Sequence, residues 1–193
     1  MKNNSNQTTM KLCLTALFAA LSFVSFKFLK IPLPGDTVLH IGNAFCVLCA
    51  IMFGGLYGGL AGSIGMTIAD LLEPAYITSA PKTFILKLCI GLITGFVAHR
   101  IAKISEDHDQ KYIFKWTVLS SVAGLAFNVI FDPIVGYFYK RYILGANADA
   151  ASIMAKWGAA ATFINAIASV IIVTVLYMAI RPIMRKMGIS VKI

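Results

Sequence analysis

The sequence predicts an all-α integral membrane protein, built as a single bundle of six transmembrane helices. Three observations support this prediction. Hydrophobic residues make up 59% of the 193-residue chain, whereas soluble domains contain about 45–50%. The mean hydropathy is +0.80. Long apolar stretches approach or exceed the roughly 20 residues that a helix needs to cross about 30 Å of hydrocarbon, and they leave too little sequence for a second domain.

The apolar stretches define the predicted spans and the domain limits. The six spans are residues 10–29, 39–53, 56–72, 83–103, 115–139 and 158–181. They form a membrane domain over residues 10–182, which follows a disordered cytoplasmic tail at residues 1–9 and precedes a basic cytoplasmic tail at residues 183–193.

The first two spans are bounded by residues that break helices. No small-residue cleavage pattern follows the first span, so we interpret it as a retained helix rather than a signal peptide. Two prolines and a glycine in residues 32–35 then produce a broken loop. The second span is short and ends at Gly54, so we expect it to be tilted or to be extended by Thr37 and Val38.

Small residues in the third span predict close helix packing. Gly55 and Gly59, and likewise Gly58 and Gly62, form small-x-x-x-small pairs. Such pairs let helix backbones approach each other closely in lipid. Before the sixth span, the alanine-rich segment at residues 146–155 predicts a short interfacial helix.

Basic residues determine the predicted orientation. The chain carries 17 Lys and Arg against 8 Asp and Glu, a formal net charge of +9. With both termini in the cytoplasm, ten of the 17 lie on the inner side, in agreement with the positive-inside rule. These ten are Lys2, Lys11, Arg100, Lys103, Lys111, Lys115, Arg181, Arg185, Lys186 and Lys192. The positive charge indicates contact with anionic lipid headgroups of the plasma membrane, not with nucleic acid.

No motif in the sequence indicates an enzyme, a cofactor or a metal. The chain has no P-loop, no H-E-x-x-H and no nucleophile with a histidine at the same depth. Cys46 and Cys49 have the C-x-x-C spacing, but they lie in an apolar span with no further ligands nearby, so we interpret them as buried apolar residues. A transport role would therefore need energy from a partner or from a gradient.

Polar residues inside the spans are the candidates for function, because polar groups in lipid are costly and face the bundle interior. Asn128 and Asp132 are four residues apart and share a helix face, as do Thr162 and Asn165, three apart. The candidate substrate-binding residues are Lys87, Asn128, Asp132, Asn165, Thr162, Trp157, Phe84, His40 and Asn43. Amides, an amine and a carboxylate beside aromatic rings suit a small, ring-shaped polar ligand.

The same polar residues also have a purely structural interpretation. Lys87 and Asp132 would then form an ion pair, and the amides would link neighbouring helices. For Asp70, at the end of the third span, we expect a capping or pairing role in the following loop rather than contact with a ligand.

The run from the second to the fourth span resembles the substrate-binding S components of energy-coupling factor (ECF) vitamin transporters. The resemblance covers about residues 10–182. Its motifs are His40-Ile-Gly-Asn43, the glycine-rich run from Phe53 to Gly62, Ala69-Asp70-Leu71 and Ala80-Pro-Lys-Thr-Phe84. In the first span, Ala16 and Ala20 supply the A-x-x-x-A spacing that forms the docking surface in that family.

The resemblance implies a function in transport. The chain would bind a vitamin or vitamin precursor in an outward-facing pocket lined by spans four to six, with the broken loop after the first span as a lid. It would dock through Ala16 and Ala20 on a coupling membrane subunit that works with two ATPase subunits, and it would topple in the bilayer to release the ligand. A hydroxymethylpyrimidine- or pyridoxine-like ring is the first expectation for the ligand, and riboflavin is the second.

The residues alone leave two functions of other classes open. A structural or assembly membrane protein without a ligand predicts no saturable binding and tolerance of substitutions at Asn128 and Asn165. A solitary ion-coupled carrier that uses Asp132 with Lys87 predicts uptake by the purified protein in liposomes without ATPases.

Overall fold

The computed structural model describes residues 2–34 and 37–186. The described residues form six α-helices: α1 (Lys2–Phe28), α2 (Gly42–Phe53), α3 (Gly55–Leu71), α4 (Ala80–Gly95), α5 (Gln110–Phe138) and α6 (Ala148–Lys186). The shorter elements are strands β1 (Ile31–Leu33) and β2 (Thr37–Leu39) and the helical turns η1 (Ile77–Ser79), η2 (Phe96–Ile101) and η3 (Tyr139–Ile143). The predicted all-α fold is confirmed, with one small hairpin added to it.

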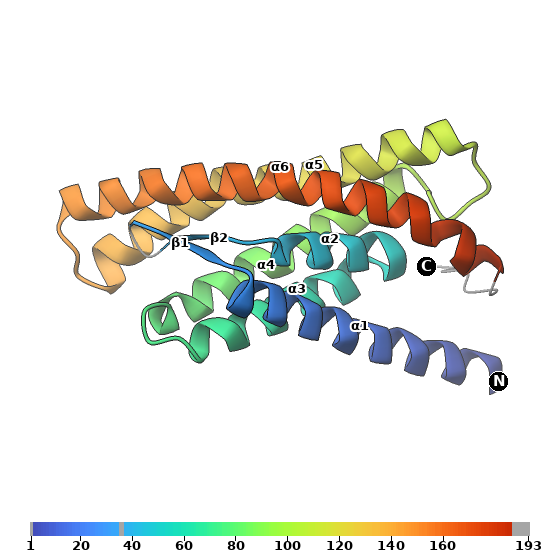
Figure 1. Cartoon of the computed structure of the whole chain (residues 1–193), viewed down its shortest axis with the longest axis horizontal. Helices are drawn as coiled ribbons and strands as arrows, with labels where there is room; N and C mark the ends of the chain where they lie inside the picture. The colour runs from blue at the N-terminus through green and yellow to red at the C-terminus, as the bar shows by residue number, and fades with distance from the viewer. Residues whose placement is uncertain (1, 35–36, 187–193) are drawn as a thin grey trace.

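The helices run along one long axis in two layers (Figure 1). α5 and α6 lie side by side and form one layer, and α1 lies on the far side of the other helices. Contacts of α2 with α6 and of α4 with α5 join the layers. α1 begins and α6 ends at the same end of the molecule, which we call the termini end; the β1–β2 hairpin lies toward the opposite end, the hairpin end (Figure 1).

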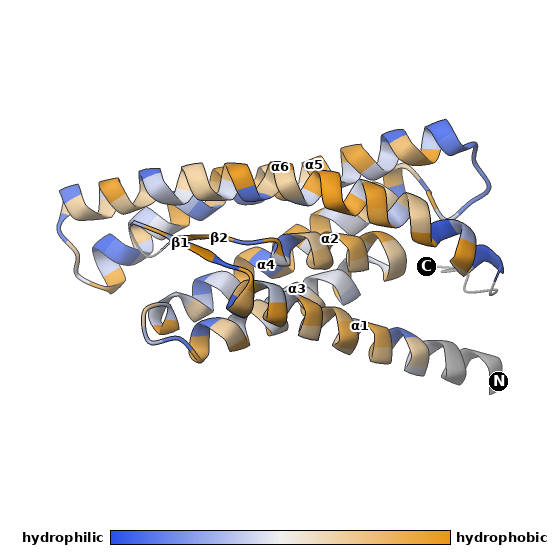
Figure 2. Ribbon diagram, viewed as in Figure 1, coloured by the Kyte–Doolittle hydropathy of each residue, from blue (hydrophilic) through white to orange (hydrophobic). Residues whose placement is uncertain are grey.

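The bundle has the apolar surface of a membrane protein. Four segments are long and apolar enough to cross a membrane: Thr8–Phe28, Ile77–Ile101, Gln110–Ile143 and Ala148–Lys186. α2 and α3 are shorter, with 12 and 17 residues, so they extend for about 18 and 26 Å. Hydrophilic residues gather at the two ends of the bundle and hydrophobic residues cover its middle (Figure 2). The chain is therefore a multi-pass membrane protein.

One glycine makes the turn between α2 and α3. Gly54 has φ 106° and ψ 160°, a conformation that residues with a side chain rarely adopt. Its N–H donates to Ala50 O at 2.9 Å and closes the last turn of α2. The short second helix is not extended by Thr37 and Val38, because these residues lie in β2.

The predicted close packing of α3 is confirmed on two sides. A Cβ on Gly59 would lie 2.8 Å from Leu88 O of α4, and a Cβ on Gly91 of α4 would run into the backbone of Gly59. On the other side, a Cβ on Gly62 would lie 2.5 Å from Cys46 Sγ of α2. Glycines therefore bring α3 into direct backbone contact with α4 and close to α2.

The loop after α1 forms an antiparallel hairpin that the sequence did not lead us to expect. Pro32 of β1 lies opposite Val38 of β2. A proline is tolerated there because both strands of a two-stranded sheet are edges. The predicted lid loop thus contributes two paired strands; Gly35 and Asp36 of this loop lie outside the described residues.

Two predicted boundaries are wrong. α6 begins at Ala148, so most of the alanine-rich segment at residues 146–155 forms the first turns of α6 and not a separate interfacial helix. The predicted tail at residues 1–9 is helical from Lys2 onward. Met1 and residues 187–193 of the predicted C-terminal tail lie outside the described residues.

Candidate functional site

A polar cavity of about 80 Å³ lies at the hairpin end of the bundle. The last turns of α1 and α3, strand β2, the loop before α4, and facing turns of α4, α5 and α6 all line it. These segments are far apart in the sequence, but each begins, ends or passes at the hairpin end (Figure 1). The cavity is therefore a product of the whole bundle and not of one motif.

Three rings form one wall of the cavity. Phe26 packs edge-on against His40, with ring centroids 4.7 Å apart, and against Tyr76, with centroids 6.4 Å apart. His40 Nδ1 accepts the Gly42 N–H at 3.1 Å, which orients the imidazole. Such a wall offers faces and edges to a flat aromatic ligand.

Asp70 places a carboxylate in the cavity wall. The residue is only 2% exposed, and its Oδ2 has no hydrogen-bond partner among the described residues. Leaving a buried polar atom unpaired costs about 1–3 kcal/mol. The predicted role in the following loop belongs to the backbone of Asp70, whose carbonyl accepts the Glu73 N–H at 3.1 Å. The side chain of Asp70 lines the cavity, so its carboxylate lies close to a ligand held there.

Two polar contacts join α4 to α5. Lys82 Nζ lies 3.0 Å from Asp132 Oδ1, and Lys87 Nζ donates to Asn128 Oδ1 at 3.3 Å. Because the helices are antiparallel, the earlier lysine meets the later residue of α5. The shared face of Asn128 and Asp132 is confirmed, but the predicted Lys87–Asp132 ion pair is wrong, since Lys82 is the direct partner of Asp132.

The charged groups of the cavity balance in number. Lys87 is 6% exposed and lines the cavity together with Lys82, Asp70 and Asp132. Two amines thus face two carboxylates in a confined space. This arrangement suits a neutral or zwitterionic ligand with both donors and acceptors.

The Asn165 side chain holds the hairpin over the cavity. Its Oδ1 accepts the His40 N–H at 3.0 Å, and its Nδ2 donates to Val38 O at 3.0 Å. Almost one turn earlier on α6, Thr162 lines the cavity, with its hydroxyl donating to Gly158 O at 2.9 Å. Asn165 therefore positions the strand, while Thr162 and Gly158 form part of the wall.

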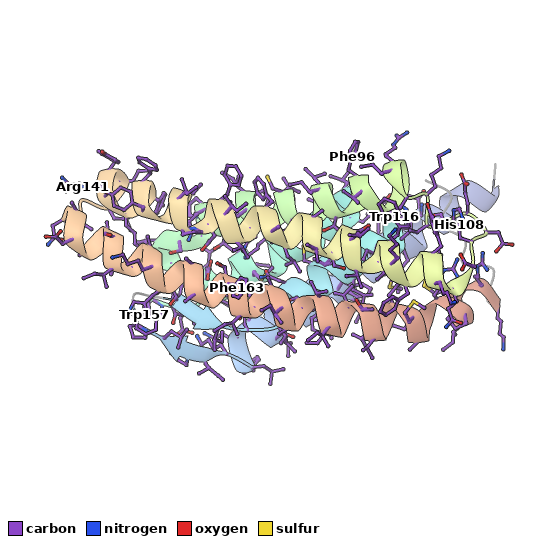
Figure 3. The ribbon with its side chains drawn as sticks, turned by 90° about the horizontal axis from the view of Figure 1, so that it is seen from above. Phe96, His108, Trp116, Arg141, Trp157 and Phe163 are labelled. Atoms are coloured by element: carbon purple, nitrogen blue, oxygen red, sulfur yellow. The ribbon has the colours of Figure 1, made fainter. Side chains whose placement is uncertain are left out.

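Four of the nine predicted substrate-binding residues line the cavity: His40, Lys87, Asp132 and Thr162. Asn128 and Asn165 do not line the cavity themselves, but their side chains form hydrogen bonds with lining residues. Asn128 bonds to Lys87, and Asn165 bonds to the backbone of Val38 and His40. Asn43 is fully buried elsewhere, and its Oδ1 has no partner among the described residues. Phe84 and Trp157 are 37% and 40% exposed and do not line the cavity; Trp157 projects from α6 on the side away from α5 (Figure 3).

Ten lining residues are absent from the predicted set, and four of these carry a charge or an aromatic ring: Phe26, Asp70, Tyr76 and Lys82. The sequence could have indicated Asp70 and Lys82 as cavity residues, because a charged residue in or beside an apolar span faces the bundle interior by default. The sequence offered no such indication for Phe26 and Tyr76, since aromatic residues at span ends usually lie at the membrane interface.

An ionic cluster ties the loop after α3 to the end of α1. Glu73 Oε2 lies 2.7 Å from Lys27 Nζ and 2.8 Å from Lys30 Nζ. These ammonium groups, Lys27 first, lower the pKa of Glu73 to about 2. Lys30 Nζ also lies 4.9 Å from the centroid of the Tyr76 ring. The cluster therefore connects α1 to the loop that carries one wall of the cavity.

The alanines predicted to dock on a partner lie on the surface of α1. Ala16 and Ala20 are exposed, as are the neighbouring Leu17 and Leu21. α1 lies on the side of the bundle opposite the α5–α6 layer (Figure 1). The surface around the alanines is thus apolar and accessible from the membrane.

Two of the four cysteines are embedded in the helix packing, whereas Cys13 is exposed and Cys89 is partly buried. Cys46 and Cys49 are free and buried, and Cys46 Sγ lies 3.6 Å from Lys87 O. Within the described ranges, no group of three His, Cys, Asp or Glu side chains could hold a metal ion.

Comparison with known proteins gives a family for most of the chain. Residues 6–182 match the family described as "ECF-type riboflavin transporter, S component". A "UPF0397 protein" of Leuconostoc citreum (strain KM20) is 28% identical over 182 residues, 92% of this chain and 90% of that protein. An "uncharacterized protein in gap 3'region" of Pyrococcus woesei is 28% identical over 122 residues, 63% of this chain and 71% of that protein. No solved structure matches the chain significantly.

Proposed function

Because the chain belongs to the family of ECF-type riboflavin transporter S components, we propose that it is the substrate-binding subunit of an ECF-type transporter in the plasma membrane. In this role it captures a vitamin or vitamin precursor outside the cell. A partner module of one coupling membrane subunit and two ATPase subunits then drives the import. The chain itself binds and releases the ligand and catalyses no reaction.

The observation that carries this proposal is the polar cavity with a buried, unpartnered Asp70 oxygen. A bundle that only needed to be stable would gain little from an unpaired carboxylate oxygen beside a polar cavity. A ligand donor placed against Asp70 Oδ2 would satisfy it. The wall of Phe26 and Tyr76 would hold the ring of the same ligand.

The size of the cavity supports a single polar ring as the ligand. Its volume of about 80 Å³ is below the roughly 300–1,000 Å³ of sites for drug-sized molecules. We therefore favour a hydroxymethylpyrimidine- or pyridoxine-like ring, whose hydroxyl and ring nitrogen would pair with Asp70 and Lys87. Riboflavin is the second candidate, which the description of the family favours; it would require the cavity to widen.

All six helices are proposed to cross the membrane, with both termini in the cytoplasm. An even number of crossings returns the chain to the side where it began, and α1 begins where α6 ends (Figure 1). Ten of the 17 basic residues then lie inside. The short α2 and α3 would require local thinning of the bilayer. In this orientation the cavity opens to the outside.

Titration calorimetry on the purified protein tests the proposed function. Hydroxymethylpyrimidine, pyridoxine and riboflavin are titrated separately into the wild type and into Asp70→Asn and Lys87→Met. We expect one of the three to bind saturably to the wild type and at least tenfold more weakly to both variants. Trp157→Phe, outside the cavity, is the matched control and should bind as the wild type does. A folded wild type that binds none of them contradicts the proposal.

The proposed docking through α1 has its own test. Ala16→Trp and Ala20→Trp would each place a bulky side chain on a flat helix face and so block close contact with the coupling subunit. We expect vitamin uptake by cells to be lost while the purified variants still bind ligand. Phe84→Trp, exposed on α4, is the control for adding a large ring to the lipid-facing surface. Loss of ligand binding in the alanine variants would contradict the docking assignment.

A further inference from the structure

An apolar groove follows the contact between α5 and α6 from mid-bundle to the hairpin end. Two hollows of about 370 Å³ each make it up. The first lies between residues 122–130 and 163–171, and the second between residues 133–138 and 152–159. Because the two helices are antiparallel and side by side (Figure 3), the hollows succeed each other along one helix pair.

The lining of the groove is suited to a hydrocarbon chain. Only Val, Leu, Ile, Ala and Phe side chains line the first hollow, and among them Ile130, Phe163 and Ile171 are more than half exposed. Ala126 and Ala166 leave the space between these larger side chains. The surface is therefore apolar, recessed and open to lipid.

The chemistry changes at the hairpin end of the groove. Tyr137, Ser152 and Lys156 line the second hollow there, and Lys156 is exposed. Arg141 follows in η3, where its guanidinium donates to Ala146 O at 3.0 Å. Hydroxyl and cationic donors thus lie at the end of an apolar channel, which complements a phosphate attached to an acyl chain.

The length of the groove matches one leaflet. From residue 122 to residue 138 the helix rises by roughly 24 Å, and one leaflet with its headgroups is about 20–22 Å thick. We propose that the groove binds one acyl chain of an anionic phospholipid, with its phosphate against Lys156. A helix of the coupling subunit is the less fitting occupant, because the α1 surface lies on the opposite side of the bundle (Figure 1). The lipid site depends on the membrane location and not on the transport role.

Native mass spectrometry with defined lipids tests the site. The detergent-purified protein is incubated with dioleoyl-phosphatidylglycerol or dioleoyl-phosphatidylcholine. Since a basic residue near an anionic lipid contributes about 1 kcal/mol, we expect about fivefold preference for phosphatidylglycerol, which Lys156→Gln abolishes. Ala126→Leu and Ala166→Leu fill the groove and should lower retention of both lipids. Ala160→Leu, exposed on α6 outside both hollows, should retain lipid as the wild type does.

Photo-crosslinking identifies the occupant in cells even if a groove variant fails to fold. p-Benzoylphenylalanine replaces Phe163, which lines the groove and faces outward, and intact membranes are irradiated. We expect adducts with the mass of a phospholipid. An adduct with another polypeptide, or equal retention of both lipids by the wild type and the leucine variants, overturns the proposal. Either result leaves the vitamin-binding test unaffected.

Discussion

Adding one methyl group at Gly158 should weaken ligand binding without preventing the protein from folding. Gly158 lies on α6 in the cavity wall, and a Cβ there would lie 3.8 Å from Asp132 Oδ2 and 3.8 Å from Thr37 Cγ2. Both are ordinary van der Waals distances, so we expect Gly158→Ala to fold. Since alanine is the better helix former, the variant should be more stable than the wild type by up to about 1 kcal/mol.

The effect on binding should be opposite in sign. The new methyl group takes space from a cavity of only about 80 Å³. Forcing an extra methyl into a filled space costs about 1–3 kcal/mol, and this cost applies to the complex but not to the empty protein. The affinity of Gly158→Ala should therefore fall by roughly 5- to 150-fold. Gly158→Leu should bind no measurable ligand.

Calorimetric titration and thermal unfolding of the same samples check both halves of this prediction. Ala160→Leu, exposed on α6 and outside the cavity, controls for added volume on the helix. A folded Gly158→Leu variant that binds ligand with wild-type affinity would refute the reasoning, because the ligand would then lie somewhere else.

Three further predictions concern packing and charge. Gly91→Ala should lower stability by about 1–3 kcal/mol, measured by thermal unfolding, because its Cβ would meet the backbone of Gly59; an unchanged transition would contradict the packing. Asp70→Asn should raise the melting temperature of the empty protein, because a buried carboxylate loses its desolvation cost; a lower temperature would mean that the carboxylate stabilises the fold. The lowered pKa of Glu73, about 2 against an ordinary 4.5, stabilises the fold above pH 4.5, and the gain is lost as the pH falls toward 2. Unfolding curves between pH 6 and 2.5 should therefore show a weaker acid dependence for Glu73→Gln than for the wild type, and equal slopes would count against the Glu73 cluster.

Hydropathy predicted the helices, and glycine spacing predicted that α3 packs closely, but not which helices it contacts. An apolar span must be helical in lipid, because its backbone polar groups have no other partners. Gly59 and Gly62 lie on two faces of α3, and each face meets a neighbouring helix. The hairpin was missed because its strands are three residues long and depend on Asn165, more than 120 positions away, for side-chain hydrogen bonds.

The site was harder to predict because one sequence does not give the rotation of a helix about its axis. The shared face of Asn128 and Asp132 followed from spacing alone. The choice between Lys82 and Lys87 as the partner of Asp132 did not, since it depends on how far α4 slides along α5. Asp70 lies at the end of the third span, so we expected a capping or pairing role in the following loop, whereas the residue lines the cavity.

The central claim is that the cavity holds one small polar ring. Native mass spectrometry of the wild type and Gly158→Leu, both purified from cells grown in rich medium, tests it most directly. We predict one bound molecule with the mass of a vitamin or vitamin precursor on the wild type and none on the variant. A folded wild type that carries no such molecule, and that also fails to bind added hydroxymethylpyrimidine, pyridoxine and riboflavin, would contradict the claim.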